Sequence, residues 1–232
     1  MVWLLISGFF CWLAFREIKG AMVARPGYGR PEPVYKPYLL VCLIFAGLFV
    51  WRPLYYWHFE RHLSLISTEL AESHPAYFHC NTAIDAMFDN DPFAAGHANP
   101  ETGEIVFQHP WCATLMDYLD HPERASRQEL HSLNMLSHES MHVRGELNEA
   151  RAECQAVQRN YRTAKLLGVS DLVARKNALD IYRNNYMQLS TAPERVAVYF
   201  SGQCAPGKDL DERLSDSTWR WLEEPYDELS SD

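Results

Sequence analysis

The sequence lacks several features that would place it in a common class of protein. No internal repeat or low-complexity tract occurs in its 232 residues, which argues against a solenoid and against a long disordered region. None of the six cysteines belongs to a CxxC pair, so a four-cysteine zinc site is not expected. No uncharged apolar run reaches the ~20 residues that a membrane-spanning helix usually needs.

Two shorter apolar runs, residues 1–15 and 38–51, lie near the N-terminus and carry no charge. The second extends to residues 37–57 if Arg52 reaches the membrane interface with its long side chain. Residues 55–57, Tyr-Tyr-Trp, are then typical of the aromatic belt at that interface. We therefore predict a membrane anchor of two apolar helices, about 1–15 and 37–57.

The segment between the two runs, residues 16–36, holds five basic residues against two acidic ones. Because basic loops stay on the cytoplasmic side, this loop is predicted to be cytoplasmic. The rest of the chain then lies outside the cytoplasmic membrane. A cleaved signal peptide is the alternative, although the sequence has neither the basic n-region nor the small-x-small cleavage site that it needs.

Basic residues are scarce in the remainder of the chain. Residues 59–232 hold 28 acidic and 15 basic residues, a formal charge of −13. Such a surface argues against nucleic acid as a partner. It does not oppose a peptide or protein substrate.

Four cysteines fall in this acidic part of the chain, and their even number is what two disulfides require in an oxidising compartment. They are Cys80, Cys112, Cys154 and Cys204. Four cysteines allow three pairings, and the sequence does not choose among them. Four buried free thiols are the alternative, since free cysteine is also a common core residue.

The chain is predicted to have three parts: the anchor 1–57, an extracytoplasmic domain 58–208 and an acidic tail 209–232. In the domain, apolar residues recur mostly at helical spacing. We expect helices at about 59–75, 80–90, 126–145, 147–167 and 171–189, and short strands at about 104–108 and 194–200. The fold class is therefore α+β, rich in helix with a small sheet.

The residues LSHESMHVRGELNEARAEC (136–154) carry the chemistry. His138 and His142 are four apart, so on a helix they share a face and can bind one zinc ion. Glu139 lies about 100° around the helix, where it can reach a water molecule at the open position of that metal. Ser126 and Glu129 form a capping box before this helix, and Gly145 ends it.

A catalytic zinc site needs a third protein ligand. Gly145 lets the chain turn back, and the next helix presents Glu149 and Glu153 on one face. Either carboxylate could complete the site. A donor for the developing oxyanion is also expected, and the candidates are Tyr161, Tyr182, Tyr186 and Arg144; none is assigned.

The pattern HExxH followed by Asn-Glu-Ala and a carboxylate four residues later resembles the zincin metallopeptidases, in their gluzincin form. The resemblance implies a zincin-like domain with His138, His142 and Glu149 as zinc ligands. It also implies that Glu139 is the general base and that Glu153 holds a ligand histidine. The layout is similar to uncharacterised actinobacterial extracytoplasmic HExxH proteins as well, through Cys112, HESMH, EARAEC and CAPGKDL.

Two departures from the family accompany this resemblance. The gap between His142 and Glu149 is much shorter than in thermolysin-like enzymes. HESMHVRGELN also follows the metzincin frame HExxHxxGxxH up to its last position, where Asn148 stands and is a poor zinc ligand.

The favoured function is a membrane-anchored zinc metallopeptidase that cleaves peptide bonds outside the cytoplasmic membrane. The alternative is a non-catalytic zincin-like binding or assembly module.

Overall fold

The computed structural model describes residues 2–22, 33–72, 74–83, 85–87, 89 and 94–222. The chain divides into two compact units, Met1–Phe59 and Glu60–Asp232. The division falls within helix α2 (Lys36–Leu70).

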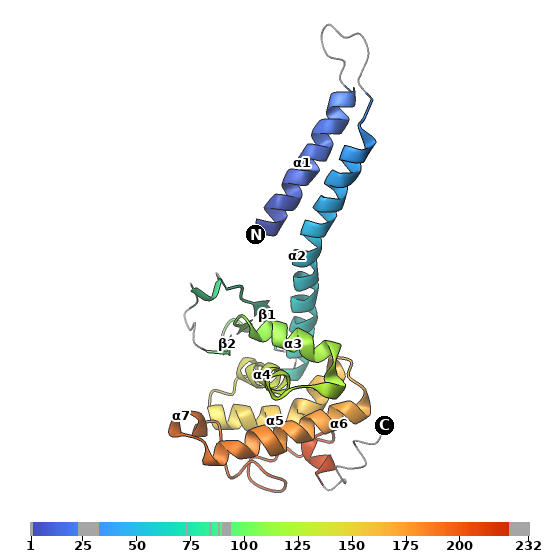
Figure 1. Cartoon of the computed structure of the whole chain (residues 1–232). Coiled ribbons are helices and arrows are strands. Elements are labelled where there is room, and N and C mark those ends of the chain that lie inside the picture. The colour runs from blue at the N-terminus through green and yellow to red at the C-terminus, as the bar shows by residue number, and fades with distance from the viewer. Residues whose placement is uncertain are drawn as a thin grey trace. The chain divides into compact units, whose positions relative to one another are not determined.

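The first unit is built from helix α1 (Val2–Met22) and the first part of α2 (Figure 1). The Ser7 hydroxyl donates a hydrogen bond to the Ala46 carbonyl at 2.9 Å, and the rings of Phe10 and Phe45 stack at 5.1 Å. Many large apolar side chains on both helices are exposed, including Leu5 and Leu48. Among the described residues, α2 is the one helix long and apolar enough to cross a membrane.

Both N-terminal helices run further than the uncharged stretches indicate. The predicted loop 16–36 begins too early, because α1 continues to Met22. Lys19 lies in its last turn, where a positive charge interacts favourably with the helix dipole. The rest of that loop, from residue 23 to 32, lies outside the described residues. Segments 37–57 and 59–75, predicted as separate helices, lie mostly in the single helix α2, which continues through Pro53 and ends at Leu70.

The second unit contains a small sheet of three four-residue strands, β1 (Tyr77–Cys80), β2 (Gly96–Asn99) and β3 (Glu104–Phe107). The order is β1-β3-β2, with β1 parallel and β2 antiparallel to the central strand. The strand predicted at 104–108 is confirmed as β3. The other two were not predicted. In β2, four residues with glycine, histidine and asparagine carry little strand pattern. β1 is also only four residues long, and its last residue, Cys80, was placed in the helix predicted at 80–90, which is wrong: its described residues form only the 3-10 turn Asp85–Met87.

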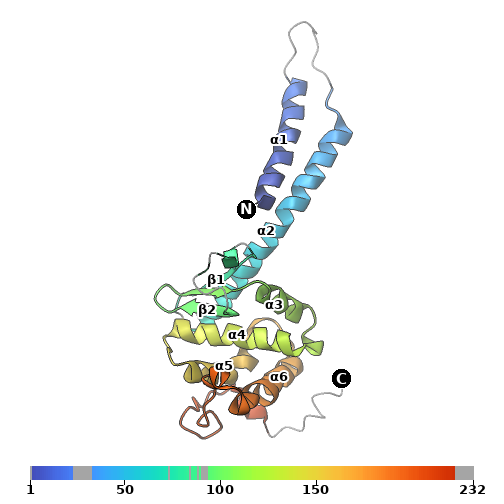
Figure 2. The ribbon, with the colours of Figure 1, turned by 60° about the vertical axis from the view of Figure 1, so that its left-hand side comes forward.

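Helices α3 (Trp111–Asp120), α4 (Arg127–Arg144), α5 (Glu149–Leu166) and α6 (Asp171–Asp180) form the bulk of this unit. Figure 2 shows the sheet lying along one side of α4, with α5 and α6 on the other side. Short 3-10 turns at Asp85–Met87 and Pro122–Arg124 connect elements. The described part of the chain is therefore a helix-rich α+β fold, as predicted.

The end of α6 changes its geometry. The helix predicted to reach residue 189 continues as a π-helical turn, η3 (Ile181–Tyr186), and then as a 3-10 turn, η4 (Met187–Thr191). The strand predicted at 194–200 is wrong: Glu194–Ala197 is the short helix α7. A lone strand needs a ladder partner, and this segment instead satisfies its amides locally, with the Pro193 carbonyl accepting from Val196 and Ala197.

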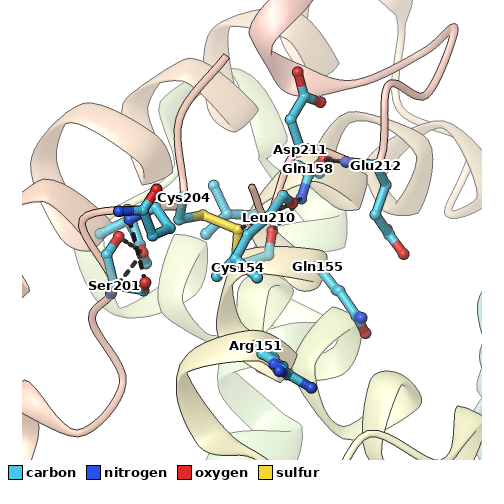
Figure 3. Close-up of a disulfide and its surroundings, with 12 residues drawn as sticks. Arg151, Cys154, Gln155, Gln158, Ser201, Cys204, Leu210, Asp211 and Glu212 are labelled. Atoms are coloured by element: carbon cyan, nitrogen blue, oxygen red, sulfur yellow. Dashed lines mark hydrogen bonds between the residues drawn. A yellow bond between two sulfur atoms is a disulfide. The ribbon is translucent and has the colours of Figure 1, made fainter. Parts of the chain in front are cut away.

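The two expected disulfides are confirmed, and the fold decides their pairing. Cys80–Cys112 joins β1 to α3, and Cys154–Cys204 joins α5 to the segment that follows α7. Figure 3 shows the second bridge beside Gln158, whose amide donates to the Leu210 carbonyl at 3.0 Å. Cys11 and Cys42 are free.

The C-terminal segment packs against α5 up to the end of the described residues. Thr218 donates to the Val157 carbonyl at 2.7 Å, and Trp219 and Trp221 in the 3-10 turn η5 (Thr218–Trp221) are buried. Part of the predicted tail 209–232 is thus integral to the second unit.

The same region contains a four-charge cluster of ion pairs, formed by Arg144, Arg159, Glu72 and Glu212. Arg144 pairs with Glu212 at 2.8 Å and with Glu72 at 2.9 Å. Fully buried Arg159 contacts the same two carboxylates. The cluster therefore joins α4, α5 and the C-terminal segment.

Candidate metal centre

The turn between α4 and α5 sets the geometry of the site. The capping box of Ser126 and Glu129 starts α4 as predicted, and Gly145 ends it with φ of 108°. Such a left-handed backbone suits glycine. The Glu146 amide donates to the Met141 carbonyl at 3.0 Å, and the Asn148 side chain accepts from the Arg151 amide, which caps α5. Asn148 therefore serves as a helix cap.

Three side chains converge across this turn: His138 and His142 from α4, and Glu149 from the first turn of α5. The two Nε2 atoms are 2.9 Å apart. The Glu149 Oε2 atom lies 3.2 Å from Nε2 of His138 and 3.5 Å from Nε2 of His142. The three donor atoms form a nearly regular triangle.

This triangle fits a metal ion in size and chemistry. Zinc–ligand bonds of about 2.0–2.1 Å in tetrahedral geometry place the ligand atoms about 3.4 Å apart. The three observed distances bracket that value within about half an ångström. His138, His142 and Glu149 could therefore hold a metal ion together, with a fourth coordination position left for another group.

The remaining nitrogen of each ring is held by an acceptor. His138 Nδ1 lies 2.8 Å from Glu153 Oε2, and His142 Nδ1 lies 2.7 Å from the Glu146 carbonyl oxygen. A carbonyl or carboxylate oxygen only accepts, so each Nδ1 carries a hydrogen. Each Nε2 lies on the side of the three donors, where it could bind a metal ion once it carries no proton. Glu153 thus lies behind the His138 ring, away from the three donors.

Glu153 is itself held by a chain of buried amides and hydroxyls. Asn134 donates to Glu153 Oε1 at 2.8 Å, and Asn160 donates to Asn134 Oδ1 at 2.7 Å. Ser137 donates to Asn160 Oδ1 at 2.9 Å and lies 2.7 Å from the Thr163 hydroxyl. This series of hydrogen bonds joins α4 to α5 and leaves the side chains of Glu153 and His138 little freedom to rotate.

Burial and charge shift the pKa values of two site residues. Burial lowers the pKa of His138, but hydrogen bonds to Glu149 and Glu153 outweigh it and raise the pKa to about 10. Burial raises the pKa of the Glu139 carboxyl to about 7 against the lowering effect of His138, and the two neighbouring carboxylates add to that rise. Metal binding must therefore displace a proton from His138.

Two cavities, of about 320 and 310 Å³, adjoin the three donors. Both are lined by His138, Glu139 and Tyr199, together with Ala94 and Gly96 at the edge strand β2. Glu139 is buried and belongs to the walls of both. A ligand at the fourth coordination position would lie in this divided cleft, beside the Glu139 carboxyl.

Tyr199 was missed by sequence reasoning, and no local signal marks it. Its ring centroid lies 5.7 Å from that of His138. The tyrosines considered from the sequence lie elsewhere: Tyr161 donates to Asp171, and Tyr182 and Tyr186 belong to a core cluster with Trp219. Arg144, the remaining candidate, lies in the four-charge cluster.

Comparisons with protein-family models, curated proteins and solved structures found no match to this chain.

Proposed function

We propose that the protein is a zinc-dependent metallopeptidase whose catalytic residues lie in the second unit. The observation that carries this proposal is the triangle of two imidazole nitrogens and one carboxylate oxygen beside a cleft that contains Glu139. Two histidines and a carboxylate with an open fourth position are typical of catalytic zinc. The zincin resemblance of HESMH and NEARAE agrees with this assignment.

When bound, a zinc ion supplies Lewis acidity and lowers the pKa of a water molecule at its open position. Glu139 is the general base: it takes a proton from the attacking water and passes it to the leaving amine. Glu153 and the Glu146 carbonyl orient the two imidazoles. Tyr199, whose ring lies beside that of His138, is our candidate donor to the substrate carbonyl as its charge develops.

The edge strand β2 supports a peptide as the substrate. In the described sheet β2 pairs with β3 alone, and an extended peptide can add to such an edge through main-chain hydrogen bonds. Ala94, Gly96 and Ala98, spaced by two residues, line the second cavity.

The first unit supports an anchoring role. We assign α1 and α2 to a helical hairpin in the cytoplasmic membrane, with the second unit on the extracytoplasmic side. The apolar length of α2 and the two disulfides support this placement. The exposed apolar side chains of α1 and α2 also favour a lipid environment over water.

The test uses the full chain purified in detergent under oxidising conditions. We expect about one zinc ion per chain and cleavage of members of a broad peptide library. His142→Ala should lose the zinc, whereas Glu139→Gln should keep it and lose cleavage. Glu101→Gln, an exposed carboxylate in the turn before β3, is the matched control and should change neither.

Zinc bound without any cleavage would refute the peptidase and favour the alternative, a non-catalytic zincin-like binding or assembly module. Failure to bind zinc at any pH where the histidines are deprotonated would refute both.

A further inference from the structure

The larger of the two cavities extends from the metal site along the N-terminal half of α4. Its wall is mostly apolar, formed by side chains from three parts of the fold: Ala94, Ala95, Met135, Leu189 and Val196. His138 and Glu139 stand at one end. A group attached to a carbonyl at the metal position would therefore reach directly into this space.

The cavity is large enough for an aromatic side chain. A cavity of roughly 150 Å³ lined by apolar residues accommodates benzene. The volume here is about 320 Å³. Burying an apolar stem against Met135, Leu189 and Val196 would be favourable, because apolar surface on both partners leaves water.

Two polar side chains in the wall have no hydrogen-bond partner within the described part of the chain. Asn185, in the π-helical turn η3, presents an uncommitted amide, and His131 contacts only the ring of Trp111. Asn134, also in the wall, is already bonded to Glu153 and Asn160. π-helical turns are rare in proteins, but those that occur are often found at functional sites. This one brings Asn185 to the cavity.

The cavity wall disfavours an ionised occupant. An acidic side chain would lose its hydration among apolar groups and would lie near the carboxylate of Glu153, which belongs to the wall. A basic side chain would lose its hydration among apolar groups, while both oxygens of Glu153 are already bonded to His138 and Asn134. The cavity therefore suits a side chain that is uncharged and has an apolar stem.

We propose that this cavity is the specificity pocket of the enzyme and binds one uncharged substrate side chain with an apolar stem and a neutral hydrogen-bonding end, such as tyrosine or glutamine. The side chain lies next to the cleaved bond, and Asn185 hydrogen-bonds its polar end. This inference rests on the proposed peptidase function.

Cleavage specificity tests the pocket directly. Zinc-loaded full chain in detergent is assayed on peptides that differ at one position beside the cleaved bond, and kcat/KM is compared in two matched pairs, Tyr against Phe and Gln against Leu. We expect Tyr and Gln to be favoured about tenfold within their pairs, since a site that hydrogen-bonds a substrate group rejects the analogue lacking it. Asp and Lys should be the poorest residues.

Variants separate the polar contact from the shape of the cavity. Asn185→Leu should bring both ratios close to one. Val196→Trp should fill the cavity and lower kcat/KM for Tyr peptides at least tenfold more than for Ala peptides. Val198→Trp, at an exposed position outside the cavity wall, is the matched control and should leave the preferences unchanged.

A binding measurement separates this inference from the proposed function. N-acetyl-tyrosinamide and N-acetyl-phenylalaninamide are compared by ligand-observed NMR on the full chain carrying Glu139→Gln, with and without Asn185→Leu. Tyr-selective binding that Asn185→Leu removes supports the pocket even if no peptide is cleaved. Cleavage that prefers Asp or Lys, or ratios that Asn185→Leu leaves unchanged, would overturn the pocket and leave the peptidase standing. Absence of both cleavage and selective binding overturns the two together.

Discussion

Glu149 and Glu153 lie one helical turn apart on α5, yet the structure predicts very different effects when each is changed. Glu149 Oε2 is 3.2 and 3.5 Å from the two Nε2 atoms, on the side where the metal would lie. Glu153 contacts the opposite nitrogen of the His138 ring at 2.8 Å. Removing Glu149 should delete a metal ligand, whereas altering Glu153 should only weaken the contact that orients the ligand His138.

The expected size of each effect follows from typical zinc energetics. Structural zinc sites with four ligands bind with roughly 10–16 kcal/mol, so an equal share is roughly 2.5–4 kcal/mol for each ligand. Glu149→Ala should therefore weaken zinc binding on the order of 10²–10³-fold. Glu153→Gln keeps an acceptor for His138 but disturbs the bond from Asn134, and a change of about 10–100-fold is expected.

The assay is competition between the full chain in detergent and a chromogenic zinc chelator at pH 7.5, with circular dichroism to verify that each variant is folded. Glu101→Gln controls for the loss of one exposed negative charge. A larger loss from Glu153→Gln than from Glu149→Ala would refute the assignment of the third ligand. Unchanged affinity in Glu149→Ala would show that the observed triangle is not the metal site.

Three further predictions follow from contacts outside the donor triangle. Asn134→Leu should lower zinc affinity about 10–100-fold, because Glu153, which contacts His138 Nδ1, loses the hydrogen bond from Asn134. Replacing Cys154 and Cys204 by alanine should lower the free energy of unfolding by roughly 4 kcal/mol in urea, from a closed loop with sequence separation 50. Burial raises the pKa of Glu212, but hydrogen bonds from Arg159 and Arg144 outweigh it and lower this pKa below its ordinary value. The ionised carboxylate therefore stabilises the fold above the ordinary glutamate pKa, and this stabilisation is lost as pH falls. Glu212→Gln should destabilise by about 2 kcal/mol at pH 7 and much less at pH 3.

Each of these three has a matched control. Asn177→Leu removes another buried asparagine, which bonds to Tyr118, and should change stability without changing zinc affinity. Cys11→Ala removes a free cysteine and should leave the urea midpoint unchanged. Glu101→Gln should show no pH-dependent loss of stability. Equal effects in a variant and its control would contradict the corresponding prediction.

Local signals predicted helix α4 and the first turn of α5 well. Ser126, Glu129 and Gly145 act through hydrogen bonds within a few residues, so their effect is readable from spacing alone. The four-residue spacing of the two histidines in HESMH likewise places both imidazoles on one face. These features need no knowledge of the rest of the chain.

Other features escaped because distant residues decide them. Strands β1 and β2 exist through pairing with β3, and β2 also packs on α4. Each has only four residues, which is too few to show a clear period. The segment 194–200 has strand composition but no ladder partner, so it folds as α7 and a turn. Tyr199 approaches His138 only because that turn lies against α4.

The sequence by itself determined the shared helix face of the two histidines with Glu139 beside them, the glycine turn, the number of disulfides and the apolar length of α2. Each of these depends on spacing along one element or on composition, both of which are local properties. Tertiary structure alone decided which glutamate faces the metal position, how the cysteines pair and what lines the cleft. Helix spacing left Glu149 and Glu153 equivalent, and the packing of α5 against α4 separated them: one carboxylate meets Nε2 of His138, and the other meets Nδ1.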